Sequence, residues 1–466
     1  MTQPDLWRFS ARELGKMLTR GDISAAALLE SCLRQIDRLN PAVNAVVTLD
    51  VDGAREAARR ADQRRHRGER LGPLDGLPVT IKDNIFVGGM RTTWGSLLYE
   101  DFIPSDDDNS VARLRAAGAV IVGKTNTPEL ALSAVTDNRI FGPTRNPWNL
   151  QLTPGGSSGG AVAAVATGMA PLALATDAGG SIRRPCAYAG TVGLKPSNGR
   201  IPKIGGFPRT AFDFQCVGPI ARSVDDVAMM FDVIAGRAEH RDPPPGVRLR
   251  IRSVLRLPGQ PIDPAVVESV TRVAVRLAGL GHEVEEGPLP VDLVEVDELW
   301  SVFTTAGVAH AVVQHDGWMD RVGDGIRNMA QAGQTLSASA YVRALERLVS
   351  LRARMAEAMA EIDLLLLPCS PALPWIIGDP FPKLIGGETA GPRAAAAFVT
   401  FVNATGQPAI ALPADPTPDG LPVGFQLVGR AGADELLLVV AKEYESAHPF
   451  SDRWPTLRGP NGDMAV

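Results

Sequence analysis

Two glycine-rich loops contain the serines in this sequence that are best placed for chemistry. The first loop runs from Thr153 to Gly160 and reads TPGGSSGG, and the second runs from Asp177 to Arg183 and reads DAGGSIR. Because glycine has no Cβ and adopts backbone angles that other residues resist, such loops can aim several backbone N–H groups at one point. Converging N–H groups are what an oxyanion requires, and a serine hydroxyl is a nucleophile once a neighbour takes its proton. The two loops therefore indicate acyl-transfer chemistry.

These loops and a third segment together resemble the amidase signature family. In the third segment, VTIKDN, Lys82 ends a short β-branched run that begins at Val79. The family combines a lysine in a K-D-N-like context, a serine in a G-G-S-S-G-G loop and a nucleophilic serine in D-x-G-G-S-I-R. Further matching segments are Gly123–Asn126, Asn146–Trp148, Gly193–Pro196 and Gly406–Ile410. The match is dense over residues 74–225, moderate over 360–445 and absent from about 235 to 355.

The resemblance assigns a role to each matched residue. It implies that Ser181 is the nucleophile, that Ser157 relays the proton after a cis peptide bond, and that Lys82 is the base. Backbone N–H groups near Ser181 are expected to hold the oxyanion, and other loop residues to support it. The oxyanion donors would be Ala178, Gly179, Gly180 and Ser181, and the supporting residues Asp177, Arg183 and Ser158. No cofactor and no metal ion is implied.

Lys82 can act as a base only when it is uncharged. A lysine with its ordinary pKa near 10.4 keeps its proton at neutral pH, as general reference values show. Burial disfavours the ammonium form, so the end of an apolar strand suits a lysine base. The competing interpretation is a structural ion pair between Lys82 and Asp83 or another acid.

The spacing of apolar runs predicts an α/β fold. Strands separated by helices indicate a parallel or mixed sheet covered by helices on both faces. The family resemblance implies the amidase signature fold, with a central mixed, mostly parallel sheet. We expect a single domain over residues 1–466, with a catalytic core at 70–225, a variable substrate-side segment at 235–355 and a C-terminal part of the core at 360–445. The proline-rich segment Arg241–Pro245 is a candidate boundary. A long helix at 337–361 and a buried strand at 364–367 are also expected.

Two other motifs have weaker interpretations. Gly118–Thr125 matches the P-loop pattern literally, but its four variable residues read as a strand rather than as a phosphate cradle. Gly155–Gly159 matches the nucleophile elbow G-x-S-x-G, which requires a buried strand directly before it and a histidine partner later in the chain. The residues before Gly155 are poor strand formers, and no histidine has a recognisable partner. Neither a nucleotide site nor an α/β-hydrolase is therefore favoured.

Composition limits the partners of the chain. A net charge of −5 argues against a nucleic-acid surface, and no apolar stretch approaches the length that a membrane span needs. The N-terminus has no apolar core of a signal peptide, and the four cysteines are widely spaced. We therefore expect a cytoplasmic protein with reduced thiols, no nucleic acid and no membrane among its partners, and we leave a homodimer open.

The function that these features predict is hydrolysis of a carboxamide C–N bond in a small molecule. Aryl amides, carbamates and hydrazides need only another leaving group. The main alternative is the glutamine-hydrolysing A subunit of a tRNA-dependent amidotransferase, since the same motifs serve both. No evident polar clamp for glutamine lies at 300–400, which favours the stand-alone enzyme; a non-catalytic binding protein on this scaffold is a further alternative. Aromatic residues that could line the pocket, or simply pack in the core, are Trp300, Phe303, Trp318, Trp375 and Phe381.

Overall fold

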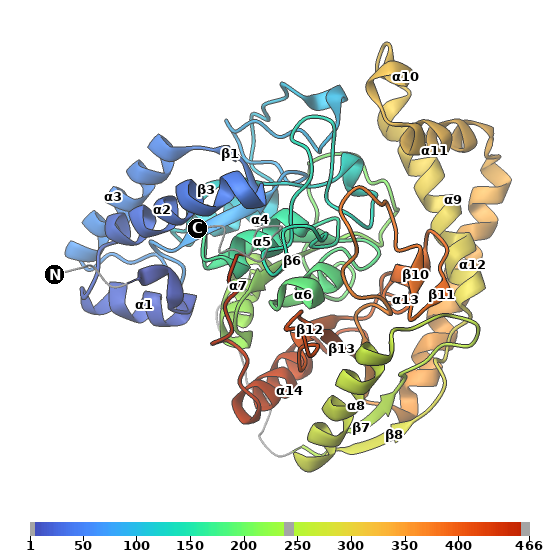
Figure 1. The fold of residues 1–466 in the computed structure, drawn as a ribbon. Coiled ribbons are helices and arrows are strands. Elements are labelled where there is room, and N and C mark those ends of the chain that lie inside the picture. The colour runs from blue at the N-terminus through green and yellow to red at the C-terminus, as the bar shows by residue number, and fades with distance from the viewer. Residues whose placement is uncertain (1–4, 237–246, 458–466) are drawn as a thin grey trace.

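The fold is organised around one long sheet, seen in a computed structural model that describes residues 5–236 and 247–457 (Figure 1). The proline-rich segment Arg241–Pro245 lies outside the described residues. In order across the sheet, the eleven strands are β1 (Val46–Leu49), β3 (Val120–Thr125), β2 (Pro78–Lys82), β4 (Leu172–Asp177), β6 (Cys216–Ala221), β5 (Val192–Lys195), β12 (Ala409–Pro413), β13 (Gly424–Gly429), β9 (Leu364–Pro368), β7 (Arg250–Ser253) and β8 (Glu283–Glu286). A separate small hairpin joins β10 (Leu384–Ile385) to β11 (Glu388–Thr389).

The sheet is mixed, as expected. Strands β3, β2 and β4 pair in parallel near one end, and β9, β7 and β8 pair in parallel at the other. Between these groups, β4, β6, β5, β12, β13 and β9 pair antiparallel, and the edge strand β1 is antiparallel to β3. The α/β fold with a mixed sheet is confirmed, and the parallel pairing that was expected for most of the sheet is concentrated in the two outer groups.

Helices cover the middle of the sheet on both faces. Helices α5 (Gly159–Ala166) and α6 (Arg183–Ala189) pack on each other, and so do α7 (Val224–Ala235) and α14 (Asp434–Ala447). Both α5 and α7 contact β4 and β6, and both α6 and α14 contact β12 and β13, so the two pairs lie on opposite faces. This covering explains why every residue of β4 is buried, since a strand packed on both faces excludes water from all its side chains.

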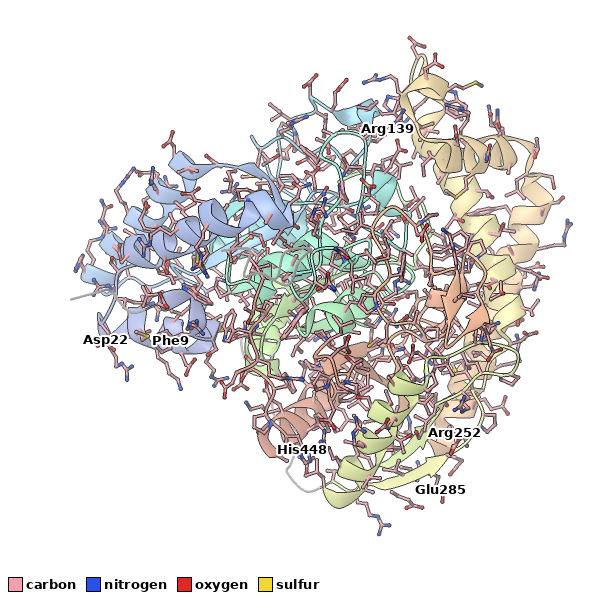
Figure 2. All side chains as sticks on the ribbon, viewed as in Figure 1. Phe9, Asp22, Arg139, Arg252, Glu285 and His448 are labelled. Carbon is pink, nitrogen blue, oxygen red and sulfur yellow. The ribbon has the colours of Figure 1, made fainter. Side chains whose placement is uncertain are left out.

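The remaining helices surround this core. They are α1 (Ala11–Arg20), α2 (Ala25–Val43), α3 (Val51–His66), α4 (Asn109–Ala116), α8 (Pro264–Gly279), α9 (Leu293–Val312), α10 (Trp318–Arg321), α11 (Asp324–Thr335), α12 (Ala338–Ala358) and α13 (Thr400–Thr405). Figure 1 shows α9 to α12 along one side of the molecule, away from α1 to α3. Helix α9 contacts α11, α12 and α13, which brings the segment without family motifs against the late part of the chain. Charged side chains such as Arg139, Arg252 and Glu285 lie towards the outside (Figure 2).

Several local predictions are confirmed. The expected helix at 337–361 is α12, and the expected strand at 364–367 is β9. Val120–Thr125 forms the buried strand β3, so the residues that a P-loop needs as a phosphate cradle are part of the sheet. Among the helices that the structure describes, none combines the length and the apolar character that crossing a bilayer requires.

Candidate active site

The three residues with the strongest motif context meet at one edge of the sheet. Lys82 is the last residue of β2, Ser157 lies just before α5, and Ser181 lies between the end of β4 at Asp177 and the start of α6. Strands β2 and β4 are parallel neighbours, so their carboxyl ends lie at the same edge. This is the edge at which open α/β sheets usually bind their ligands.

The amine of Lys82 is fully buried among oxygen atoms. Its Nζ lies 2.7 Å from Ser157 Oγ, 2.9 Å from Ser158 Oγ and 3.1 Å from Thr176 Oγ1. The carbonyl oxygen of Thr176 is a further acceptor at 3.4 Å. Burial lowers the pKa of Lys82 well below its usual value, and the negative charge of Asp177 only partly opposes this. Burial therefore makes the ammonium form of Lys82 less favourable than that of an exposed lysine.

The ion pair considered as an alternative for Lys82 is not formed with Asp83. The Asp83 carboxylate accepts hydrogen bonds from the backbone N–H of Thr93 at 3.0 Å and from the Thr93 hydroxyl at 2.5 Å. Its cationic neighbour is Lys124, with 3.9 Å between Lys124 Nζ and Asp83 Oδ1. Within the described residues, no carboxylate lies within ion-pairing distance of Lys82. Lys82 thus lacks the partner that would hold it in the ammonium form.

The hydroxyls of Ser157 and Ser158 both reach Lys82 but differ in their other contacts. Ser158 Oγ donates to the carbonyl oxygen of Thr176 at 3.1 Å. Ser157 Oγ has Lys82 as its hydrogen-bond partner and no other among the described residues. The peptide bond between Gly156 and Ser157 is cis, as the family resemblance implied. Of the two hydroxyls, that of Ser157 is the one without a second hydrogen-bond partner among the described residues.

Ser181 is nearly buried, with 8% of its surface exposed, and its backbone is tied to the first loop. The backbone N–H of Ser158 donates to the carbonyl oxygen of Ser181 at 3.2 Å. In the part of the chain that the structure describes, the Ser181 hydroxyl makes no hydrogen bond. The structure therefore brings the two loops together and leaves the Ser181 hydroxyl without a competing partner.

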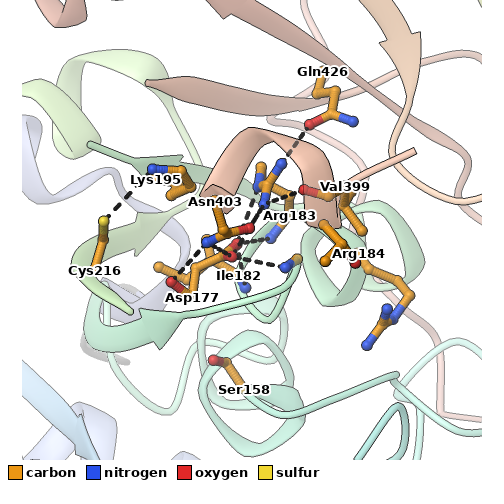
Figure 3. A network of polar contacts seen from close by, with 12 residues as sticks. Ser158, Asp177, Ile182, Arg183, Arg184, Lys195, Cys216, Val399, Asn403 and Gln426 are labelled. Atoms are coloured by element: carbon orange, nitrogen blue, oxygen red, sulfur yellow. Dashed lines mark hydrogen bonds and ion pairs between the residues drawn. The ribbon is translucent and has the colours of Figure 1, made fainter. Parts of the chain in front are cut away.

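Asp177 organises the loop that carries Ser181. Its carboxylate accepts hydrogen bonds from the backbone N–H groups of Gly180 at 2.7 Å and Ile182 at 3.0 Å, and it pairs with Arg183 at 3.0 Å (Figure 3). Burial acts to raise the pKa of Asp177, but the charge and hydrogen bonds of Arg183 outweigh it and hold that pKa below its usual range. The N–H of Gly180, one of the expected oxyanion donors, is therefore already bonded to Asp177.

Arg183 joins this loop to the late part of the chain. Its guanidinium donates to Asn403 Oδ1 at 2.6 Å, to Gln426 Oε1 at 2.9 Å and to the carbonyl oxygen of Val399 at 3.1 Å (Figure 3). Asn403 in turn donates to Asp177 Oδ1 at 2.9 Å. Residues 70–225 and 360–445 therefore contribute to one continuous polar network.

Sequence reasoning missed several residues of this network. Asn403 and Gln426 had no local signal, because their partners are far away in the sequence. Arg184, which donates to the carbonyl oxygen of Gly156 at 2.8 Å, follows directly after the motif that contains Ser181. Thr176, whose hydroxyl also accepts from Asn84 Nδ2 at 2.9 Å, directly precedes that motif. Of these four residues, only Thr176 and Arg184 lie next to the Asp177–Arg183 motif in the sequence, and so only they could have been found from it.

The glycines beside Ser181 are required by close packing. A Cβ on Gly180, which has a φ of +97°, would lie 2.3 Å from Val399 Cγ2. A Cβ on Gly179 would lie 3.0 Å from the indole ring of Trp300. Trp300 thus borders the loop, whereas Phe303, Trp318 and Trp375 are buried in apolar clusters. Among the described residues, no group of three His, Cys, Asp or Glu side chains is suited to hold a metal ion.

Comparison with known proteins matches almost the whole chain to one protein family. The Amidase family profile matches residues 27–438. The A subunit of the glutamyl-tRNA(Gln) amidotransferase of Symbiobacterium thermophilum is 36% identical, over 97% of this chain and 99% of that protein. The putative amidase AmiB2 of Mycobacterium bovis is 37% identical, over 98% of this chain and 100% of that protein.

A solved structure extends the comparison to three dimensions. A 6-aminohexanoate cyclic dimer hydrolase in complex with substrate superposes with a TM-score of 0.86 at 30% identity, covering 97% of this chain and 99% of that chain. The proteins that resemble this chain thus include a putative amidase, a cyclic dimer hydrolase and one component of an amidotransferase.

Proposed function

Because the chain belongs to the amidase family, we propose that it hydrolyses carboxamide C–N bonds through an acyl-enzyme on Ser181. Ser157 and Lys82 move the protons. The observation that carries this proposal is the buried Lys82 amine, which lies 2.7 Å from the Ser157 hydroxyl and has no carboxylate partner within the described residues. A lysine in such a position is suited to accept a proton rather than to hold one.

In the first half of the reaction, Ser181 Oγ attacks the amide carbon. The Ser181 proton passes to Ser157 Oγ as the Ser157 proton passes to the uncharged Nζ of Lys82. The resulting tetrahedral intermediate carries a negative oxygen. When the C–N bond breaks, Ser157 donates a proton to the departing amine and recovers one from Lys82, which leaves an ester on Ser181.

The negative oxygen would be held by backbone N–H groups of the Ser181 loop. No hydrogen bond of the described residues uses the N–H groups of Ala178, Gly179 or Ser181, whereas the N–H of Gly180 serves Asp177. We therefore retain the first three as oxyanion donors and give Gly180 the role of fixing the loop. Each such donor typically contributes about 3 kcal/mol to the transition state.

In the second half, water attacks the Ser181 ester. The same relay removes a proton from the water molecule and returns one to Ser181 Oγ as the acid leaves. The relay therefore sets the type of reaction, and the residues around the loop set the choice of substrate.

Linear amides, aryl amides, carbamates and hydrazides are small molecules compatible with this chemistry. The four buried free cysteines fit a cytoplasmic enzyme.

The proposal is tested by a hydrolysis screen over aliphatic amides, anilides, carbamates and glutamine. Wild-type protein is compared with Ser181→Ala, and a fluorophosphonate probe is used to label the nucleophile. We expect turnover and labelling in the wild type and neither in Ser181→Ala, with both proteins equally folded by circular dichroism. Labelling of another serine, or turnover retained in Ser181→Ala, would refute the assignment.

A second function is favoured by the full-length similarity to the A subunit of an amidotransferase. In that case the same relay would release ammonia from glutamine within a complex. Activity confined to glutamine, together with copurification of partner proteins, would support this function over a stand-alone amidase. Hydrolysis of anilides by the isolated chain would support the stand-alone enzyme.

A further inference from the structure

A pocket of about 570 Å³ lies beside the Ser181 loop. It is formed by the start of α9, residues 259–261 and the segment from 389 to 400, and its size is within the range of small-molecule sites. Its lining is mostly apolar, with a few polar side chains. Among the lining residues are Leu293, Val296, Ala397, Asp297, Arg393 and Thr400.

The pocket is connected to the Ser181 loop through Trp300 and Thr400. The Trp300 ring lies 3.0 Å from where a Cβ on Gly179 would be, and Thr400 Oγ1 lies 3.7 Å from the same point. The guanidinium of Arg393 lies over Trp300, 5.1 Å from the ring centroid, and donates to Thr400 Oγ1 at 3.3 Å. Arg393 is thus separated from the loop by a single layer of side chains.

The hydrogen bonds of Arg393 leave part of its guanidinium free. Nε and Nη2 both reach Asp297 Oδ1, at 2.8 Å and 2.7 Å, and Nη1 makes no hydrogen bond with the described residues. The side chains of Arg393 and Asp297 are 38% and 52% exposed. Ion pairs this exposed contribute little to stability, so an incoming anion can replace Asp297 at small cost. A planar guanidinium is well matched to a carboxylate, which it binds through two parallel N–H groups.

We propose that this pocket binds a carboxylate of the substrate through Arg393, which exchanges Asp297 for the ligand. The preferred substrates are then amides that carry a carboxylate at a distance from the scissile bond, with Trp300 packing against the intervening carbon chain. This inference rests on the proposed amidase function and specifies its substrate class. The pair was not visible in the sequence, because Asp297 and Arg393 are 96 residues apart.

The test compares substrates that differ only in charge. Glutaryl 4-nitroanilide and pentanoyl 4-nitroanilide have acyl chains of equal length that end in a carboxylate and a methyl group. In Arg393→Gln, we expect kcat/KM for the glutaryl substrate to fall by about 10- to 100-fold, as loss of a charged hydrogen bond predicts. The value for the pentanoyl substrate should stay close to that of the wild type.

Asp297→Asn is the matched control, because its expected effect has the opposite sign. Removing the competing carboxylate should raise kcat/KM for the glutaryl substrate and leave the pentanoyl substrate unchanged. A second pair, 4-acetamidobenzoate and acetanilide, places the carboxylate on the amine side of the scissile bond. The pair whose charge preference depends on Arg393 identifies the side that the pocket accepts.

The possible results separate this inference from the proposed function. If the wild type hydrolyses both members of each pair equally well, the inference is overturned and the amidase function stands. Equal losses for charged and neutral substrates in Arg393→Gln would show a structural role and also overturn it. If the wild type hydrolyses none of these anilides and its Ser181 is not labelled, the proposed function itself fails.

Discussion

Two fully buried lysines on neighbouring strands have different surroundings. Lys82 ends β2, and Lys124 lies in β3, where it is the register partner of Ile81. Burial lowers the pKa of both amines, because it disfavours the charged ammonium form. The two residues therefore share their strand environment and differ mainly in what their amines contact.

The contacts of the two amines explain why one is a candidate base and the other is not. Lys124 donates to the carbonyl oxygen of Ile85 and to the Thr92 hydroxyl, and Asp83 lies 3.9 Å away. Burial lowers the pKa of Lys124 to about 8, and Asp83 is the main opposing charge. Among the described residues, the hydrogen-bond partners of the Lys82 amine are all hydroxyl and carbonyl oxygens. A nearby acid keeps the proton on a buried lysine, whereas hydroxyl neighbours favour a neutral amine and offer a route for the proton.

The largest expected difference between the two lysines is in activity. Lys82→Met removes the amine while keeping a side chain of similar length, and should lower kcat/KM by at least about 1000-fold, because general base catalysis is lost. Measurement uses the amide that the wild type hydrolyses best. Lys124→Met is the matched control, and its folded fraction should retain activity near the wild-type value. A similar loss in both variants would contradict the distinction.

Ser157 and Ser158 provide a second contrast around the same amine. Ser157→Ala removes the hydroxyl that has no other partner, and should lower kcat/KM by about 100- to 1000-fold because the proton relay is broken. Ser158→Ala removes a hydroxyl already bonded to the Thr176 carbonyl, so its loss of activity should be much smaller. Steady-state kinetics of both variants, with circular dichroism as a folding control, decide the matter. A larger loss in Ser158→Ala would reverse the assignment.

The sequence was informative where the site is made of local segments. Lys82, Ser157 and Ser181 each lie in a short motif, so their types and neighbours marked them as candidates. In the structure Lys82 contacts Ser157, and the backbone of Ser181 contacts that of Ser158. Asn403 and Gln426 could not be found in this way, because they contact Arg183 across 220 and 243 residues. The direction of the middle strands was equally hidden, since a continuous buried run such as β4 contains no information about its partners.

The same limit applies to charge pairing. Asp83 follows Lys82 in the sequence, and an ion pair between them was a reasonable interpretation. Asp83 lies in the turn directly after β2, where its carboxylate accepts from Thr93 and lies near Lys124 instead. Lys124 itself was visible in the family match Gly123–Asn126 and in a P-loop-like pattern, but its burial in β3 and its position beside Asp83 required the structure.

The next contrast concerns stability. Lys124→Met leaves the Asp83 carboxylate buried without its cation, and should reduce the free energy of unfolding by about 2 to 3 kcal/mol. Adding Asp83→Asn to Lys124→Met should cost less than the sum of the two single changes, because the two groups interact. Urea denaturation of the single and double variants measures this coupling. Strict additivity would show that the 3.9 Å pair contributes nothing.

The smallest expected effect, and the most specific, is the dependence of stability on pH. Unfolded chains keep the proton of a lysine up to its ordinary pKa of 10.5, whereas folded Lys82 loses it at a lower pH. Between these two values the unfolded state binds more protons, so raising the pH stabilises the fold by up to about 1.4 kcal/mol per pH unit. Lys82→Met lacks this contribution. Its stability relative to the wild type should therefore decline steadily as the pH rises.

Lys124→Met supplies the reference curve for this measurement. Because the pKa of folded Lys124 is lowered only to about 8, its contribution begins to vary with pH near that value. The pH dependence removed by Lys82→Met should begin at a distinctly lower pH, since no acid pairs with Lys82 in the described part of the chain. Urea denaturation at half-unit pH steps, carried downwards from about pH 9.5 until each variant and the wild type change in parallel, measures both onsets. If the pH dependences of stability removed by Lys82→Met and by Lys124→Met began at the same pH, the acid beside Lys124 would not distinguish the two amines. The assignment of Lys82 as the base would then lose this support.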